Sequence, residues 1–320
     1  MDITEDELLA AIRRVLSVSD PAIVVAVGDD AAVVGSGAGD LVLTTDTVVD
    51  GVHVDRATAT ARDIGYKAVA VTVSDVAAMA ASPRFALSSL TLSPDVDAAW
   101  TMELFGGMRE ACDEFAVALV GGNVSSAPVV SVAVMLTGEV APGRAVARAG
   151  AEPGDVVTVT GSLGGAAAGL RLTSDATHGR NVTDDVRDAI RRLQRPTPRV
   201  GEAQVIARHG ATAMIDVSDG LAIDLTRLCE ASGVGVRLDL ARIPAHPAAA
   251  EGEALGGGED YELIATMPSD AAASDAAAEL REVFGVPLTA IGRISASGLE
   301  AVDADGTSRP LERRGWDHFA

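Results

Sequence analysis

The sequence predicts a two-domain protein of mixed α/β (α+β) class. Its 320 residues, 48% of them hydrophobic, are enough for two domains that each bury a core. Strand-like segments alternate with helix-like segments in both halves, which is typical of α/β architectures. Two Pro-Gly pairs punctuate residues 141–155 between the halves. We therefore expect one domain over residues 1–145 and a second over residues 146–320.

The first half predicts helices and strands in an irregular order. Thr4 and Glu7 form a capping-box pattern before apolar residues at helical spacing, which predicts an N-terminal helix. Apolar runs and alternating patterns then predict strands at residues 41–45, 84–92, 116–120 and 129–139. Longer apolar periodicity predicts helices at residues 63–81 and 100–115.

The second half repeats the alternation. Its strands are expected at residues 156–160, 213–217, 235–240, 261–266 and 288–294. An alanine-rich helix is expected after Gly164, and two further helices at residues 221–231 and 271–284. The charged residues of 173–200 predict a solvated helix followed by a turn at its prolines. The order of strands in a sheet does not follow from these patterns.

Charge and cysteine content exclude several classes of partner. The net charge is −21 and Lys67 is the only lysine, which argues against nucleic acid and against an anionic membrane as partners. No apolar run approaches membrane-spanning length. Cys112 and Cys229 lie among apolar residues without metal-site spacing, so we expect buried, reduced thiols. A reducing cytoplasm is the compartment that fits.

Acidic motifs at or beside apolar stretches give the strongest indication of function. They are Gly28-Asp29-Asp30, Thr44-Thr45-Asp46, Ser74-Asp75 and Asp216-Val217-Ser218-Asp219. A single such motif is an ordinary turn or helix cap. Four of them bring together carboxylates that repel one another unless cations lie between them, and Mg²⁺ binds carboxylates, hydroxyls and phosphate oxygens. The sequence therefore predicts a site for a magnesium-bound nucleotide.

Common phosphate-binding loops are absent from the sequence. There is no P-loop motif, and Lys67 lies inside a predicted helix. The glycine-rich segment 161–165 has two interpretations: an anion cradle at a helix N-terminus, or, the one we favour, a turn that allows close helix packing. Phosphate charge would then be met by metal ions, backbone amides and selected arginines.

Three further positions also keep two interpretations. Gly121-Gly122-Asn123, after the predicted strand 116–120, is either a turn or a place where the backbone approaches a triphosphate. Arg148 is either a surface residue or a phosphate partner. His53 is either a polar turn residue or a substrate contact.

Two motifs near the C-terminal end are less ordinary. Gly256-Gly257-Gly258-Glu259-Asp260-Tyr261-Glu262-Leu263 combines three glycines, which allow close approach of a ligand, with acids where a strand is expected to begin. Gly315-Trp316-Asp317-His318-Phe319 places an aromatic cluster near the end of the chain. A flat cationic heterocycle can stack on such a cluster.

Together these motifs resemble the thiamine-monophosphate kinase family, of the aminoimidazole ribonucleotide synthetase-like superfamily. The resemblance runs from Gly28 to Phe319 and keeps the order of the motifs. It implies ATP-dependent phosphorylation of thiamine monophosphate to thiamine diphosphate by in-line transfer assisted by several Mg²⁺ ions. It also implies an N-terminal ATP- and magnesium-binding domain that dimerises through its sheet, and a C-terminal α/β domain that completes the active site.

The resemblance also assigns roles to residues. The Mg²⁺ ligands it implies are Asp29, Thr44, Thr45, Asp46, Asp75, Asn123, Asp216 and Asp219, of which Asp29, Asp46, Asp75 and Asp219 are the expected catalytic group. The implied ATP contacts are Gly122, Asn123, Arg148 and Ser218. The implied contacts to the thiamine substrate are His53, Glu259 and Trp316.

Asn123 departs from the family pattern, which commonly has an aspartate there. The exchange replaces an anionic ligand with a neutral one, so we expect one metal to bind more weakly. Two alternatives remain open at this point: a nucleotide-binding regulator without turnover, for which Asn123 is the one sequence indication, and a related synthetase of the same superfamily. Release of ADP distinguishes the regulator from an enzyme.

Overall fold

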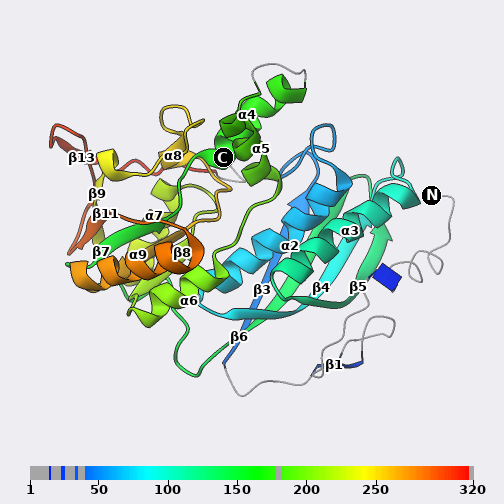
Figure 1. Cartoon of the computed structure of the whole chain (residues 1–320), viewed down its shortest axis with the longest axis horizontal. Helices are drawn as coiled ribbons and strands as arrows, with labels where there is room; N and C mark the ends of the chain where they lie inside the picture. Colours follow the sequence, from blue (N-terminus) through cyan, green and yellow to red (C-terminus); the bar gives the residue numbers. More distant parts are fainter. Residues whose placement is uncertain (1–13, 16–22, 26–32, 35–39, 178–181, 317–320) are drawn as a thin grey trace. The chain divides into compact units, whose positions relative to one another are not determined.

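The structure, a computed structural model, describes residues 14–15, 23–25, 33–34, 40–177 and 182–316. The chain divides into two compact units (Figure 1). The first comprises Met1–Val76 and Ala81–Gly143, and the second comprises Ala77–Ala80 and Arg144–Ala320. Both are mixed α/β in content, as the sequence predicted.

The first unit contains a four-stranded sheet in the order β3-β6-β4-β5. Its strands are β3 (Asp40–Val49), β4 (Ser82–Leu92), β5 (Ala118–Ser126) and β6 (Ser131–Val140). β6 pairs antiparallel with both β3 and β4, whereas β4 and β5 are parallel. Two short strands, β1 (Ile23–Val25) and β2 (Val33–Val34), pair with each other in a separate ribbon.

Two helices, α2 (Ala61–Ala78) and α3 (Ala98–Glu114), belong to this unit apart from the last two residues of α2. Asp97 caps α3 by accepting a hydrogen bond of 2.8 Å from the Trp100 amide. The two helices approach closely because a Cβ on Gly65 would overlap the Leu104 carbonyl, and one on Gly107 would overlap the Arg62 carbonyl. Figure 1 shows the helices side by side over the strands.

The second unit contains a seven-stranded sheet in the order β13-β12-β9-β11-β7-β10-β8. Its strands are β7 (Val156–Thr160), β8 (Ala213–Asp216), β9 (Gly235–Asp239), β10 (Leu263–Met267), β11 (Leu288–Ser295), β12 (Leu299–Val302) and β13 (Ser308–Pro310). Only the β12–β9 pair is parallel among the described pairs of this sheet.

Helices and one 3₁₀ turn complete the second unit. They are α4 (Gly165–Thr177), α5 (Asp184–Gln194), α6 (Val200–Arg208), α7 (Leu221–Ser232), η1 (Leu240–Arg242), α8 (Glu253–Gly256) and α9 (Asp270–Phe284). One apolar cluster, which includes Leu225 and Ile264, packs α7 with the sheet. A second, which includes Ile206 and Leu280, packs α6 and α9 with the sheet.

Several predicted elements end elsewhere in the structure. Of the two interpretations of Gly121-Gly122-Asn123, the turn does not fit, because these residues continue strand β5. Strand β3 runs past the predicted end at residue 45, so Asp46 lies within the strand and not after it. The strand expected to begin at Tyr261 begins at Leu263. The predicted N-terminal helix lies outside the described residues, apart from Arg14 and Val15.

Two other predictions concern burial and membranes. Cys112 and Cys229 are buried free thiols, as expected. Burial raises the pKa of the Cys112 thiol to about 12 and that of Cys229 to about 11. Within the described part of the chain, no helix has the length and hydropathy needed to cross a bilayer.

Candidate active site

In the first unit, β3 and α2 bring two predicted metal-site residues together. The hydroxyl of Thr44 donates a hydrogen bond of 2.7 Å to a carboxylate oxygen of Asp75. Side chains alternate between the faces of a strand, so Asp46 lies on the same face of β3 as Thr44. Asp46 is half-buried and accepts a hydrogen bond of 2.6 Å from the Thr47 amide. This face therefore carries two carboxylates and a hydroxyl.

Thr45 differs from its neighbours. Its side chain is exposed on the opposite face of β3, where it is paired with Met135 of β6. Its hydroxyl therefore lies on the opposite side of β3 from Thr44 and Asp46. Asp29 and Asp30 lie outside the described residues, and among the residues that are described no group of three or more His, Cys, Asp or Glu can hold a metal ion.

The turn after β3 is fixed by its own hydrogen bonds. The His53 ring accepts a hydrogen bond of 3.1 Å at Nδ1 from the Val49 amide, and its carbonyl accepts one of 2.9 Å from the Lys67 ammonium. Lys67 is only 1% exposed. The sequence placed Lys67 in a helix but gave no sign that its charge is buried under this turn.

Arg56 contacts two carboxylates and the ring of Trp100. Its guanidinium bonds Asp50 at 2.6 Å and Asp95 at 3.0 Å, and lies 5.9 Å from the centre of the Trp100 ring. Arg56 and Trp100 both line a cavity of about 710 Å³ that also includes Thr58, Arg62 and Glu103. The two carboxylates orient Arg56 at this surface of the first unit.

Gly122 and Asn123 lie on β5, where they face β4 across a parallel pair. Gly122 is paired with Ser88, and a Cβ on Gly122 would overlap the Ser88 carbonyl. A glycine is therefore needed here for strand packing, whether or not a ligand approaches. Asn123 is exposed one residue later on the same strand.

In the second unit, β8 ends at Asp216 and runs into a turn that a second segment holds. The amide of Glu259 donates to the Ser218 carbonyl at 2.7 Å, and the amide of Tyr261 donates to the Val217 carbonyl at 2.9 Å. The amide of Val217 in turn donates to the Glu262 carbonyl at 2.8 Å. The structure thus joins the two acidic motifs of this half, although about forty residues separate them.

The turn at 218–220 is organised by Asp224, which the sequence analysis missed. One oxygen of its carboxylate accepts hydrogen bonds from the amides of Ser218, Asp219 and Gly220 at 2.9 to 3.1 Å. Asp224 is 1% exposed, and burial raises the pKa of its carboxyl. The available signal was an aspartate in the first turn of helix α7, four to six residues after the residues of the turn.

Arg227 brings Asp219 and Asp224 together. One of its nitrogens lies 2.5 Å from Asp219 and 2.7 Å from Asp224. Asp219 therefore has a cationic partner within the chain. Asp216, at the end of β8, is 3% exposed. A metal ion that binds Asp219 would share this carboxylate with the guanidinium.

The segment 256–262 has an unusual backbone. Glu259 and Tyr261 adopt left-handed φ values of 67° and 51°, which side chains other than glycine rarely adopt. The glycines before them pack against the chain itself: a Cβ on Gly258 would lie 2.6 Å from the Ser218 carbonyl, and one on Gly257 2.5 Å from the Glu253 carbonyl. Close packing within the unit therefore already requires these glycines.

Asp260 favours the close-packing interpretation of residues 161–165, because its own carboxyl group occupies the start of helix α4. Its carboxylate accepts hydrogen bonds from the amides of Gly164 at 2.5 Å and Ala166 at 3.1 Å, at the start of α4. The anion at this helix N-terminus is therefore a side chain of the protein. Burial dominates its titration and raises the pKa of Asp260 to about 7.

Trp316 and Arg148 complete the predicted residues of the second unit. The Trp316 amide donates a hydrogen bond of 2.9 Å to the Asp219 carbonyl, while 53% of the residue's surface is exposed. Arg148 has an exposed side chain, and its carbonyl accepts a hydrogen bond of 3.1 Å from Ser232. The structure thus brings Ser218, Asp219, Glu259 and Trp316 together within the second unit.

Known proteins match both halves of the chain. The family model described as AIR synthase related protein, N-terminal domain, matches residues 28–140, and the one described as AIR synthase related protein, C-terminal domain, matches residues 152–305. The thiamine-monophosphate kinase of Escherichia coli K12 is 39% identical over 313 residues, which cover 92% of this chain and 91% of that protein.

Solved structures match over nearly the full length. The thiamine-monophosphate kinase of Stenotrophomonas maltophilia K279a superposes with a TM-score of 0.83 at 34% identity, covering 97% of this chain and 99% of that one. A structure described as AaThiL complexed with AMPPCP and TMP gives a TM-score of 0.75 at 32% identity, covering 98% and 97% of the two chains.

Proposed function

The chain belongs to the thiamine-monophosphate kinase family, and from this premise we propose that it transfers the γ-phosphoryl group of ATP to thiamine monophosphate. The products are thiamine diphosphate and ADP. The observation that carries the proposal is the similarity over more than nine-tenths of the chain to kinases of this name, one of them bound to AMPPCP and TMP. The cluster of Ser218, Asp219, Glu259 and Trp316 supports it from the structure.

Mg²⁺ is part of the proposal. The Thr44 hydroxyl, the Asp75 carboxylate and the Asp46 carboxylate are the hard oxygen donors that this ion prefers, so the donor set fits. We assign Asp29, Thr44, Thr45, Asp46, Asp75, Asn123, Asp216 and Asp219 as the ligand residues, with Asp29, Asp46, Asp75 and Asp219 as the catalytic group. When bound, Mg²⁺ neutralises the repulsion between two phosphate-bearing substrates.

The protein's own contribution to the reaction is positioning. The acceptor is a phosphate oxygen that is ionised near neutral pH, so no general base is required. We assign Gly122, Asn123, Arg148 and Ser218 to ATP. We assign His53, Glu259 and Trp316 to thiamine monophosphate, with the exposed indole of Trp316 as a stacking surface for the cationic thiazolium ring.

The proposal also covers the roles of the two domains and the oligomeric state. Residues 1–145 form the ATP-, Mg²⁺-binding and dimerisation domain, and residues 146–320 complete the site. The outer face of the β3–β6 pair exposes Leu41, Leu43 and Met135 by 55%, 65% and 42%. This exposed apolar face supports a homodimer in which a second copy of the chain covers it. The two buried free thiols support a reducing cytoplasm as the location.

Product formation tests the proposal directly. Thiamine monophosphate and ATP are incubated with the protein at low and at high salt, with and without EDTA, and the products are separated by chromatography. Metal-dependent thiamine diphosphate with an equal amount of ADP is the expected result. ATP binding without ADP release under both salts would contradict the proposal and favour a regulator.

A further inference from the structure

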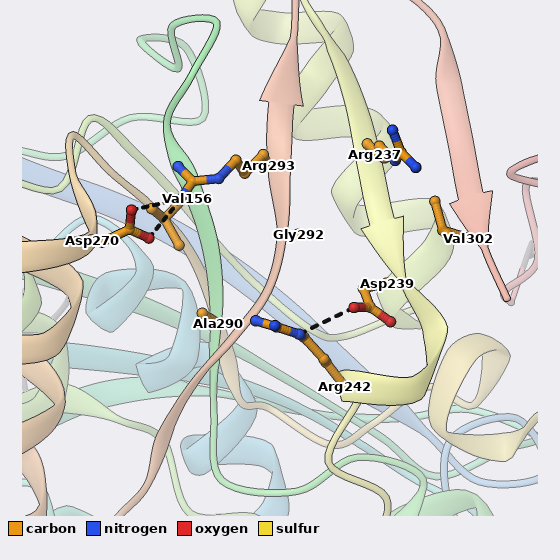
Figure 2. A pocket seen from close by; sticks show the side chains of 9 residues that line it. All are labelled: Val156, Arg237, Asp239, Arg242, Asp270, Ala290, Gly292, Arg293 and Val302. Atoms are coloured by element: carbon orange, nitrogen blue, oxygen red, sulfur yellow. Dashed lines mark hydrogen bonds and ion pairs between the residues drawn. The ribbon is translucent and has the colours of Figure 1, made fainter. Parts of the chain in front are cut away.

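A second cavity lies entirely within the second unit, on the part of its sheet that β9, β11 and β12 form. Its volume is about 460 Å³, which is within the range of small-molecule sites. Arg237, Arg242 and Arg293 line it together with Asp239 and Asp270, and Val156, Ala290 and Val302 provide apolar surface (Figure 2). Three guanidinium groups and two carboxylates give this pocket an excess of one positive charge, in a chain of net charge −21.

Two of these arginines lie directly opposite each other in the sheet. Arg293 of β11 is the register partner of Arg237 of β9. Like charges at directly opposed positions of an antiparallel pair destabilise a sheet. Asp270 offsets part of this repulsion at Arg293, and an anion in the cavity would offset it at Arg237.

Arg237 lacks a counter-ion among the described residues. Asp239 holds Arg242 at 3.1 Å and Asp270 holds Arg293 at 2.6 Å, whereas none of the described residues forms an ion pair with Arg237 (Figure 2). Glu300 is its neighbour on β12, but that carboxylate accepts a hydrogen bond of 2.8 Å from Ser308. The Arg293 side chain also donates to the Gly154 carbonyl at 3.1 Å. Arg242 and Arg293 are thus held in place by carboxylates, and the Arg237 guanidinium is available to a ligand.

The cavity is separate from the second-unit part of the candidate active site. Four strand-to-strand steps lead from β9 through β11, β7 and β10 to β8, which carries Asp216. At about 4.8 Å a step, strands β9 and β8 are roughly 19 Å apart. A ligand here does not occupy the turn that holds Asp219.

We propose that this cavity binds a phosphate-bearing small molecule. A tetrahedral phosphate presents three oxygens and can accept from two guanidinium groups at once, whereas a carboxylate saturates one in a bidentate pair. The apolar residues at the wall accommodate the organic part of the molecule. The site does not depend on the kinase function and adds a second place at which a phosphorylated compound binds this protein.

Calorimetric titration with inorganic diphosphate tests the proposal, with EDTA present to suppress metal-dependent binding and at low ionic strength to limit screening. We expect the wild type to bind, and Arg237→Gln and Arg242→Gln each to weaken the affinity by about tenfold or more. Arg313→Gln is the matched control, since it removes another exposed arginine of the same unit. Its affinity should equal that of the wild type.

Three results would overturn the proposal: no binding to the wild type, equal affinities for Arg237→Gln and Arg313→Gln, or loss of kinase turnover in Arg237→Gln, which would place this arginine in the active site. Titrations with ADP and with thiamine diphosphate identify the source of the phosphate group. If one of them binds more tightly than inorganic diphosphate, and Arg237→Gln abolishes this gain, the organic part of that compound contacts the cavity. Failure of the kinase assay with the wild type would leave the titration result unaffected, so the two proposals are tested separately.

Discussion

The backbone amide of Trp316 donates a hydrogen bond of 2.9 Å to the carbonyl oxygen of Asp219. Gly315 permits this approach, because a Cβ on it would overlap the Ile223 side chain. The link fixes the C-terminal segment to the turn that carries Asp219, and it does not involve the indole ring. A change of the Trp316 side chain therefore leaves the connection intact and alters only what the ring contacts.

Trp316→Ala should raise the KM for thiamine monophosphate by about tenfold, because a stacking contact with a cationic ring is lost. The KM for ATP and the midpoint of thermal unfolding should stay close to those of the wild type. Steady-state kinetics with each substrate varied in turn gives both values. Trp316→Phe is the control, since it keeps an aromatic face and should recover most of the affinity; an equal loss in both variants would exclude stacking.

Asn123→Asp should lower the Mg²⁺ concentration needed for half-maximal activity. The substitution replaces a neutral oxygen with a carboxylate at an exposed position of β5, and a hard divalent ion binds the carboxylate more tightly. Activity is measured across a Mg²⁺ series at saturating substrates. Ser126→Asp adds the same charge three residues along the strand, on the opposite face. If both variants shift the Mg²⁺ requirement equally, Asn123 has no special role.

Glu262→Gln should destabilise the second unit by about 3 kcal/mol, because it leaves a buried guanidinium without its main partner. Glu262 is 1% exposed and binds Arg199 through two contacts of 2.6 and 2.7 Å, while Thr160 donates to it at 2.6 Å. Urea unfolding measures the change in the free energy of unfolding.

The matched control for Glu262 is Glu279→Gln. This residue pairs with Arg208 and His209 at the surface, where water screens the charges, so its removal should cost much less stability than that of Glu262. Similar losses for the two variants would show that burial adds nothing to the Glu262 pair.

Local patterns singled out two motifs of the second unit that the structure brings together, but not the contacts that hold them. The Asp216–Asp219 and Gly256–Leu263 motifs stood out because acids and glycines gather in them, and the structure joins them through backbone hydrogen bonds. Asp224 was missed because its role depends on three amides that converge on one carboxylate oxygen only after the turn folds. The three glycines were assigned to ligand approach, although packing against Ser218 and Glu253 already requires two of them.

The first unit shows the same limit for strands. The apolar run that begins at Leu41 predicted strand β3 but not its end, since pairing with β6 continues through Asp46 to Val49. Gly121 and Gly122 indicated a turn by local preference, and the parallel pairing with β4 overrode that preference. The arrangement of Arg237 opposite Arg293 was beyond prediction for the same reason: the register of a sheet is a long-range property.

Asp260 should make the stability of the protein depend on pH between about 4 and 7. Burial raises the pKa of its carboxyl from the ordinary value of 3.8 to about 7, with a smaller contribution from Glu262 that the Gly164 and Ala166 amides and Arg192 oppose. Because the folded state then binds a proton that the unfolded state has released, this contribution to stability is fully present below pH 4 and is lost as pH rises to about 7.

Asp260→Asn cannot titrate, so the difference in unfolding free energy between wild type and variant should fall across this range and become constant above it. Urea unfolding of both proteins at a series of pH values measures that difference, in which the other carboxylates of the chain cancel. A difference that stays constant from pH 4 to 8 would show that the two amide donors at the start of α4 keep Asp260 ionised throughout.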